Sequence, residues 1–394
     1  MRAAPSPVQL RQRAGLVVTV VGLAWLVLAA RLIQLQAWQQ VELTGRAERQ
    51  REFVEDVIPR PGDIYDAHGR LLATTITASS LYVAPLELLD DRNVADRLAD
   101  ALNLDADELS QRIARHAEKH FLWVRRRLSD EETRRIRALK LPPHGWGLRE
   151  EFQRIYPQGP LAAQVLGLRD IDGVGRGGIE ESCDAELRGT PGQRRLTRDS
   201  RGRVIDVVDD PEHLAHPGRD VVLTLDAVIQ LFTERALDEL VAEAQPEACC
   251  AIVLDPNSGD VLGMASRPSF DPNHADKVPD AAWKNRAIAD IYEPGSTFKP
   301  MIVAYGLDRR MLDVSDHYDC EWGRYRMGRR LLHDHHPYGT LSLAEVLVKS
   351  SNIGMAKVGE RLTNAGLHSA AALFGFGRRT GIELPGELPG ILRP

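Results

Sequence analysis

The first strong pattern along the chain is a run of seventeen uncharged residues, Ala14 to Ala30, rich in Leu, Val and Ala. Its length is at the short end of what spans a bilayer. Three arginines precede it: Arg2, Arg11 and Arg13. No acidic residue occurs before Glu42, so we expect a cytoplasmic N-terminus. The run is long for a signal peptide, and we predict an uncleaved anchor over residues 14–35 with the rest of the chain outside the cytoplasm.

The middle of the chain predicts a polar module. A helical, polar pattern continues from Arg31 to about Glu55. Residues 58–73 then predict two extended segments joined by a turn at His68-Gly69. Leu86 to Leu148 is charged and predicts helices, one of which begins at a capping box formed by Ser129 and Glu132.

Beyond Arg219 the pattern changes to short apolar strands and amphipathic helices. Residues 221–226 predict a strand, and the apolar positions between Ile229 and Val241 predict a helix. Residues 251–254 and 261–265 predict two strands of a hairpin joined by an Asp-Pro-Asn-Ser-Gly turn. A helix beside an antiparallel hairpin indicates an α+β domain with helices packed on a sheet.

Candidate chemistry begins at Ser296 and Lys299, in the sequence Ser-Thr-Phe-Lys. The spacing of Phe298, Ile302 and Tyr305 predicts a helix that starts here, after a Pro-Gly turn. Residues three apart share a helix face, so the lysine can reach the serine hydroxyl and, once deprotonated, act as its base. The helix N-terminus adds donors for an oxyanion. The alternative is a solvated lysine one turn after a capping serine.

A second polar group, Ser350-Ser351-Asn352, follows about fifty residues later. Ser342 and Glu345 form a capping box for the helix that precedes it, and Ile353 begins another helix. A serine and an asparagine at such a junction either point into a cleft or serve as turn formers. Their pairing with Ser296 favours the cleft.

Composition excludes several other functions. The net charge of −6 does not favour nucleic-acid binding, and we expect a basic cluster at 125–127 to form a solvated or protein-contacting face. The four cysteines form no Cys-x-x-Cys pair, and adjacent Cys249 and Cys250 are expected to be small buried side chains. The His-Asp-His-His stretch at 333–336 lacks the spacing of a hydrolytic zinc site, and we expect a loop there.

Together these motifs resemble those of class B penicillin-binding proteins, from the anchor to the last residue. The segment at 58–73 is similar to the opening of that family's N-terminal module, with Pro61 and Ala67 at the positions of two family arginines. Glu180 matches a family glutamate. The motifs from Ser296 to Lys299 and from Ser350 to Gly354 match those of the catalytic domain, and Ser-Ser-Asn-Ile-Gly resembles the septal, cell-division type.

The resemblance implies a D,D-transpeptidase of peptidoglycan. Ser296 would attack the D-Ala-D-Ala end of a stem peptide, release D-Ala and form an acyl-enzyme that a neighbouring stem peptide's amine resolves into a cross-link. Lys299 would be the base, Ser350 would relay a proton to the leaving amine, and Asn352 would bind the substrate backbone and Lys299. β-Lactams would acylate Ser296 as substrate mimics. No metal or other cofactor is implied.

The same resemblance implies a domain plan. It consists of a cytoplasmic tail (1–13), the anchor (14–35), a non-catalytic pedestal for dimerisation and interaction (36–218) and a β-lactamase-like transpeptidase domain (219–394). Expected partners are the membrane, stem peptides, β-lactams, a polytopic glycan polymerase of the SEDS type and other division proteins.

One departure from the family is large, because no Lys-Thr-Gly occurs in the sequence. In the family this third motif lies on a strand beside the serine and supplies an oxyanion donor. We therefore expect an incomplete domain and a 394-residue chain with poor activity, which efficient labelling by a fluorescent penicillin would contradict. Two other functions stay open: a non-catalytic division scaffold, and a β-lactam sensor or hydrolase.

Overall fold

The structure is a computed structural model, and it describes residues 7–39, 52–88, 92–141, 145–198, 204–209, 211 and 213–393. The chain divides into two compact units, each described here by itself. The first comprises Met1–Arg60 and Gly189–Gly218, and the second comprises Pro61–Arg188 and Arg219–Pro394. The predicted boundary between residues 218 and 219 stays a prediction.

The first unit contains the long N-terminal helix α1 (Pro7–Ile33), followed by one π-helical turn (Gln34–Trp38). Residues Gly15–Ala37 are long and apolar enough to cross a membrane, with a mean hydropathy of 2.4. A three-stranded antiparallel sheet has the order β1 (Glu52–Val57), β8 (Gly192–Arg198), β9 (Val204–Asp209). The helical prediction is therefore wrong from Glu52 onward, because β1 pairs with β8 along its whole length. Residues 40–51 lie outside the described residues.

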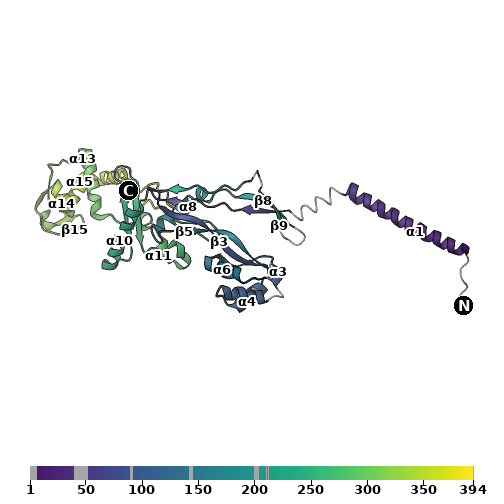
Figure 1. The fold of residues 1–394 in the computed structure, drawn as a ribbon. Helices are drawn as coiled ribbons and strands as arrows, with labels where there is room; N and C mark the ends of the chain where they lie inside the picture. Colours follow the sequence, from purple (N-terminus) through teal and green to yellow (C-terminus); the bar gives the residue numbers. More distant parts are fainter. Residues whose placement is uncertain are drawn as a thin grey trace. The chain divides into compact units, whose positions relative to one another are not determined.

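A five-stranded sheet forms the first half of the second unit (Figure 1). Its central strand is β3 (Leu71–Val83), which pairs antiparallel with β2 (Ile64–Tyr65), β4 (Leu122–Leu128) and β5 (Trp146–Ile155). The predicted hairpin with its turn at His68-Gly69 is confirmed by the pairing of β2 with β3. The short strand β10 (Val221–Val222) returns from much later in the chain and pairs parallel with β2.

Helices pack beside the end of this sheet at which β3 finishes. They are α3 (Pro85–Leu88), α4 (Arg92–Ala101), α5 (Ala106–Ala114) and α6 (Asp130–Ala138). The capping box of Ser129 and Glu132 at the start of α6 is confirmed. The helical prediction is wrong over β4 and β5, where pairing with β3 overrides the local pattern. The basic cluster is half-buried and paired rather than solvated: Arg125 contacts Glu132, and Arg126 contacts Glu151, each at 2.6 Å.

A buried network of ion pairs lies in this half of the unit, centred on Glu180. Smaller elements surround it: α7 (Ala163–Leu166), β6 (Leu168–Arg169), β7 (Gly175–Arg176), α8 (Gly178–Ser182) and α9 (Asp184–Arg188). Glu180 is fully buried and accepts hydrogen bonds from Arg154 (2.6 Å) and Arg169 (3.0 Å). Arg154 also donates to the Gly62 carbonyl at 2.6 Å. A buried charge is tolerated only when it is paired, so Glu180 ties three segments together.

The second half of the unit begins with the predicted helix α10 (Ala227–Ala244) on the predicted hairpin of β11 (Cys249–Leu254) and β12 (Val261–Arg267). These elements are confirmed. Both Cys249 and Cys250 were expected to be buried, but Cys249 is half-buried and Cys250 is exposed, because β11 turns alternate side chains to solvent. The structure thus has the predicted α+β architecture.

Helix α10 is capped by two carboxylates, Asp226 directly before it and Asp66 from the turn between β2 and β3. Asp226 accepts from Val228 and Ile229 of α10, while the buried Asp66 accepts from the Ala227 N–H at 3.1 Å. Arg70 donates to both carboxylates. Oxygen or nitrogen atoms of Asp66, His68 and Asp226 lie within 4.8 Å of one another, and Arg70 forms an ion pair with each of the two acids.

The elements from the turn Gly295–Phe298 onward pack around a core of their own, which includes Ile302, Val346 and Ile353. Two short helices before them, Asp280–Trp283 and Arg286–Ala289, pack instead against the core that contains Leu72 and Met264. The helices are α11 (Asp280–Trp283), α12 (Arg286–Ala289), α13 (Lys299–Asp308), α14 (Leu343–Val348) and α15 (Asn352–Leu373), which is kinked at Thr363. The 3₁₀ turns are Pro272–Lys277, Gly295–Phe298 and Glu321–Gly323. The strands are β13 (His317–Asp319), β14 (Arg324–Met327), β15 (Arg330–His333) and β16 (Thr340–Ser342).

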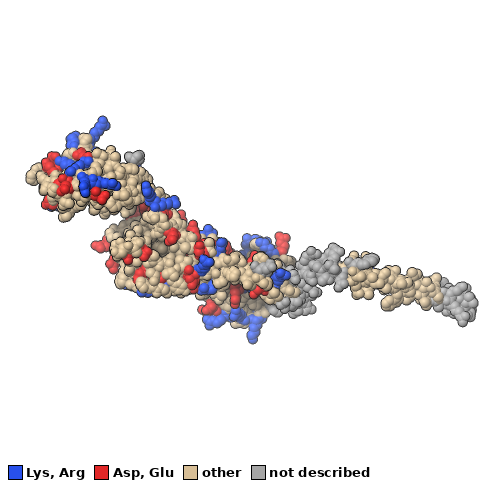
Figure 2. Space-filling model, turned by 90° about the horizontal axis from the view of Figure 1, so that it is seen from above, with Lys and Arg blue, Asp and Glu red and all other residues tan. Residues whose placement is uncertain are grey.

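Charges of both signs are intermixed on the face of the molecule in Figure 2. No field of one sign covers that face, in accord with the small net charge. Most of the described length of α1 is tan in the same view, as the apolar composition of Gly15–Ala37 requires.

Candidate active site

Ser296 lies in the 3₁₀ turn Gly295–Phe298, directly before α13. The turn begins at Gly295, whose φ of +60° is easy for a residue without a Cβ. The backbone N–H of Lys299 bonds back to the Ser296 carbonyl, as in a tight helical turn. Ser296 is exposed, so its hydroxyl is accessible to a substrate.

Lys299 is the centre of the polar contacts. Its Nζ donates to Ser350 Oγ at 3.0 Å, to Asn352 Oδ1 at 2.9 Å and to the Ser350 carbonyl at 2.8 Å. Ser350 Oγ in turn lies 2.9 Å from Ser296 Oγ. Among the described residues no hydrogen bond joins Ser296 Oγ directly to Lys299 Nζ. The structure thus brings all four predicted residues together, with Ser350 between the serine and the lysine.

Ser350 has an unusual backbone conformation. The Ser351 N–H bonds to the Val346 carbonyl and the Ser350 N–H to the Leu347 carbonyl, so α14 ends in a Schellman motif. Ser350 occupies its left-handed position, with a φ of +51°, where glycine is the usual residue. This conformation costs a residue with a Cβ roughly 1–2 kcal/mol. Strain of this kind is typical of functional positions, because packing alone would favour glycine.

The next two residues begin α15. Ser351 is buried and caps the helix by accepting from the Gly354 N–H at 2.9 Å. The Asn352 side-chain amide donates to the His333 carbonyl at 3.1 Å, which leaves its oxygen facing Lys299.

The sequence did not identify Asp334 as part of this site. Its carboxylate accepts hydrogen bonds from the Ser351 hydroxyl (2.6 Å) and from the Asn352 (2.5 Å) and Ile353 (3.0 Å) backbone N–H groups. The signal available in the sequence was the His-Asp-His-His stretch, which drew attention for its histidines. Only the tertiary contact between the end of β15 and the start of α15 reveals the aspartate.

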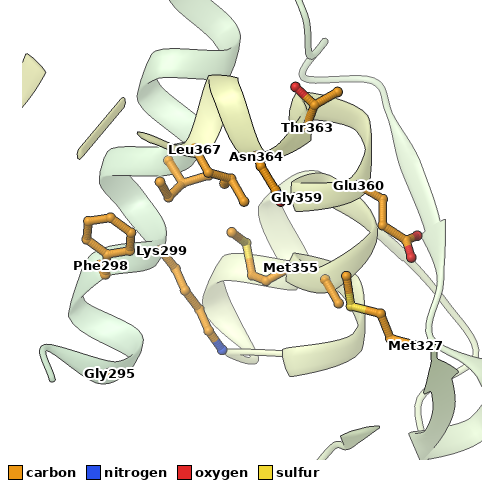
Figure 3. Close-up of a pocket in the computed structure, with 12 residues that line it drawn as sticks. Gly295, Phe298, Lys299, Met327, Met355, Gly359, Glu360, Thr363, Asn364 and Leu367 are labelled. Carbon is orange, nitrogen blue, oxygen red and sulfur yellow. The ribbon is translucent and has the colours of Figure 1, made fainter. Parts of the chain in front are cut away.

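Lys299 borders a cavity of about 500 Å³ between α13 and α15. Figure 3 shows its side chain reaching along one wall toward the beginning of α15, with Phe298, Met355 and Leu367 also around the cavity. Burial lowers the pKa of the Lys299 ammonium, and the negative charge of Asp334 opposes this shift without cancelling it. A lysine with a lowered pKa is more readily deprotonated and can accept a proton from a hydroxyl.

Comparison with known proteins supports this assignment. Residues 57–223 match the family described as "Penicillin-binding Protein dimerisation domain", and residues 249–394 match "Penicillin binding protein transpeptidase domain". The chain is 34% identical over 371 residues to "Peptidoglycan D,D-transpeptidase FtsI" of Escherichia coli, covering 92% of the chain and 62% of that relative. It is 32% identical over 335 residues to "Probable peptidoglycan D,D-transpeptidase PenA" of Neisseria meningitidis, covering 84% and 57%.

A solved structure shares the fold. A "peptidoglycan synthetase" from Bifidobacterium adolescentis has a TM-score of 0.63 and 25% identity, covering 87% of this chain and 67% of that one. The chain spans about three fifths of the length of the curated relatives named above. With both domain families matched in order and the candidate motifs inside the second, the chain belongs to the class B penicillin-binding proteins of the FtsI type.

Proposed function

We propose that the protein is a membrane-anchored peptidoglycan D,D-transpeptidase of the division septum and a target of β-lactams. The observation that carries the proposal is the hydrogen-bonded sequence from Ser296 through Ser350 to Lys299. It couples a hydroxyl at the surface to an amine with a lowered pKa. Relatives with transpeptidase names and the matched transpeptidase domain support the same reaction.

In the first step, Ser296 Oγ bonds to the carbonyl carbon of the penultimate D-Ala. The amide C–N bond breaks, and D-Ala leaves. The Ser296 proton passes through the Ser350 hydroxyl to neutral Lys299, and the same hydroxyl can return it to the leaving amine. This path needs only the two contacts of 2.9 and 3.0 Å already present.

In the second step, the amine of a neighbouring stem peptide attacks the acyl-enzyme. A new amide bond forms, the ester bond to Ser296 breaks, and the amine's proton returns through the same groups to Ser296. Asn352 holds Lys299 through its side-chain oxygen and can orient the peptide backbone of the substrate. Each group therefore acts in both steps.

The location follows from the anchor. Residues Gly15–Ala37 would cross the membrane once, with the N-terminus in the cytoplasm and the catalytic domain outside it. Substrates would be stem peptides ending in D-Ala-D-Ala. Protein partners would be a polytopic glycan polymerase of the SEDS type and other division proteins, as the family resemblance implies.

A donor and acceptor exchange assay tests the reaction and separates the alternatives. Because the 394-residue chain is expected to be poorly active, the assay uses a form extended by a segment that carries the family's Lys-Thr-Gly motif, called the full-length protein from here on. It is incubated with a synthetic stem peptide ending in D-Ala-D-Ala and with isotopically labelled D-Ala as acceptor. A transpeptidase incorporates the label into the peptide. A scaffold and a β-lactam sensor or hydrolase leave the peptide unchanged. The rate at which a penicilloyl adduct is released then identifies a β-lactam hydrolase, because a transpeptidase should release it slowly.

Two variants complete the assay. Ser296→Ala should abolish incorporation, while Ser258→Ala, an exposed serine in the turn between β11 and β12, should leave it unchanged. If Ser296→Ala retains the activity of the parent protein, the proposed function is wrong.

A further inference from the structure

The end of strand β15 holds the start of α15 in place. Asp334 follows β15 directly, and its two carboxylate oxygens serve different groups. One accepts from the Ser351 hydroxyl, and the other accepts from the Asn352 and Ile353 backbone N–H groups. Hydrogen bonds to a charged acceptor are stronger than neutral ones, so this carboxylate fixes the turn that carries Ser350 and Asn352.

The preceding residue fixes the orientation of Asn352. The His333 carbonyl can only accept, and it takes the Asn352 side-chain N–H₂ at 3.1 Å. A flipped amide would set two acceptors against each other at His333 and two donors against each other at Lys299. Residues 333 and 334 therefore determine which atom of Asn352 faces the amine.

The same carboxylate acts on Lys299 through space. Asp334 is the charged group that favours the protonated form of Lys299, against the effect of burial. Glu360, on α15, borders the same cavity and accepts from the Tyr325 hydroxyl at 2.9 Å. The nearby lysines are paired, Lys349 with Glu345 and Lys357 with Glu321. The Ser350 and Asn352 side chains that touch the amine are uncharged.

We propose that Asp334 is a positioning residue of this active site, which holds the Ser350-Ser351-Asn352 turn in its working geometry and sets the pH range over which Lys299 serves as a base. The proposal rests on the proposed function. It assigns two separable effects to one side chain: a geometric effect through Ser351 and the backbone, and an electrostatic effect on the amine.

Two variants separate these effects. Asp334→Asn removes the charge and keeps one acceptor oxygen for the Asn352 and Ile353 N–H groups, but its N–H₂ cannot accept from the Ser351 hydroxyl, so the electrostatic effect is lost and the geometric effect is weakened. Ser351→Ala keeps the charge of Asp334 but removes both the hydrogen bond to that carboxylate and the cap that Ser351 provides to the Gly354 N–H, so it is a purely geometric change. Asp319→Asn is the matched control, because Asp319 is an exposed acid on the neighbouring strand β13 that accepts from the Glu321 N–H and touches none of the four site residues.

The measurement is the second-order rate of acylation by benzylpenicillin as a function of pH, on the full-length protein, with thermal unfolding of each variant. We expect Asp334→Asn to lower the maximal rate about 10- to 100-fold and to move the acid limb of the profile to lower pH. Ser351→Ala should lower the rate without moving the limb. Asp319→Asn should match the parent in both.

The outcomes are distinguishable. A parent protein that benzylpenicillin does not acylate contradicts the proposed function itself. A parent that is acylated, with a folded Asp334→Asn variant of unchanged rate and profile, overturns the assignment of Asp334. A lowered rate with an unmoved acid limb in Asp334→Asn overturns the electrostatic part, because a purely structural role predicts that result.

Discussion

At the scale of single residues, the structure explains why Ser350 differs from an ordinary turn former. The sequence predicted a junction between helices at this point, and the junction is present. It could not predict the left-handed backbone, because that conformation depends on hydrogen bonds to Val346 and Leu347 that form only when α14 ends here. Its place in the site rests on the contacts of its hydroxyl with Ser296 and Lys299, since other non-glycine residues also have a positive φ.

Replacing Ser350 should separate stability from activity. In Ser350→Gly the left-handed strain is relieved, whereas in Ser350→Ala it is retained. We expect the glycine variant to be the more stable of the two by about 1 kcal/mol, as measured by urea unfolding. Both variants should lose roughly a hundredfold or more in acylation rate, because neither carries the relay hydroxyl. An alanine variant as stable as the glycine variant would contradict the strain argument.

Lys299 leads to a pH prediction. Burial lowers its pKa, so the neutral base becomes available below the ordinary lysine value of about 10.4. We expect the acylation rate of the parent protein to rise with pH along a limb whose midpoint lies below that value. Lys299→Ala should remove the limb and most of the rate. A limb centred at the ordinary lysine value would show that the amine is not perturbed.

At the scale of elements, sequence patterns predicted a feature correctly where both hydrogen-bonding residues lie within a few positions of each other in the chain. The capping boxes at Ser129 and Ser342 were predicted from four-residue patterns and are present. Strand β4 was missed, because its partner strand β3 and the acidic partner of Arg126, Glu151, lie in distant segments of the sequence. Asp334 was missed for the same reason, since its contacts lie on α15.

Because Asp66 caps α10 as a charged carboxylate, we expect its contribution to stability to depend on pH. Burial alone would raise the pKa of Asp66, but hydrogen bonds from the Ala227, Arg70 and His68 backbone N–H groups and the Arg70 guanidinium leave it below its ordinary value. Its stabilising contribution is therefore present above the unfolded pKa of about 3.9 and is lost as pH falls through the folded value.

We expect Asp66→Asn to lower the free energy of unfolding by about 2 kcal/mol at neutral pH. The difference from the parent should shrink as the pH falls below the ordinary aspartate range. Urea unfolding at several pH values measures it, with the exposed Asp260→Asn as control. A difference that is independent of pH would show that the charge of Asp66 is not what stabilises the cap.

At the scale of the whole molecule, the order of the segments along the chain could be predicted from the sequence, but their grouping into compact units could not. The apolar N-terminal helix precedes the two matched families, at 57–223 and 249–394, and the order of these three agrees with the order expected from the sequence. The predicted domain bounds and the role of the pedestal stay predictions. The grouping of residues 61–188 with 219–394 could not be predicted, since it rests on long-range contacts such as the pairing of β10 with β2 and the hydrogen bond from the Ala227 N–H to Asp66.

The anchor is tested by fractionation. We expect the protein to stay with membranes under alkaline carbonate, because the Gly15–Ala37 segment is long and apolar enough to span the bilayer. Val20→Arg combined with Leu23→Arg, near the centre of the segment, should release the protein, since each arginine costs about 2.5–3.5 kcal/mol there. Release of the parent protein under the same conditions would contradict a spanning segment.

The central claim is that Ser296 is made nucleophilic by Lys299 acting through Ser350, and the most direct test is mass spectrometry of the full-length protein after treatment with benzylpenicillin. We predict one added penicilloyl mass, located by peptide mapping on Ser296, and none in Ser296→Ala. A protein that gains no covalent mass, or gains it on another residue, would contradict the account.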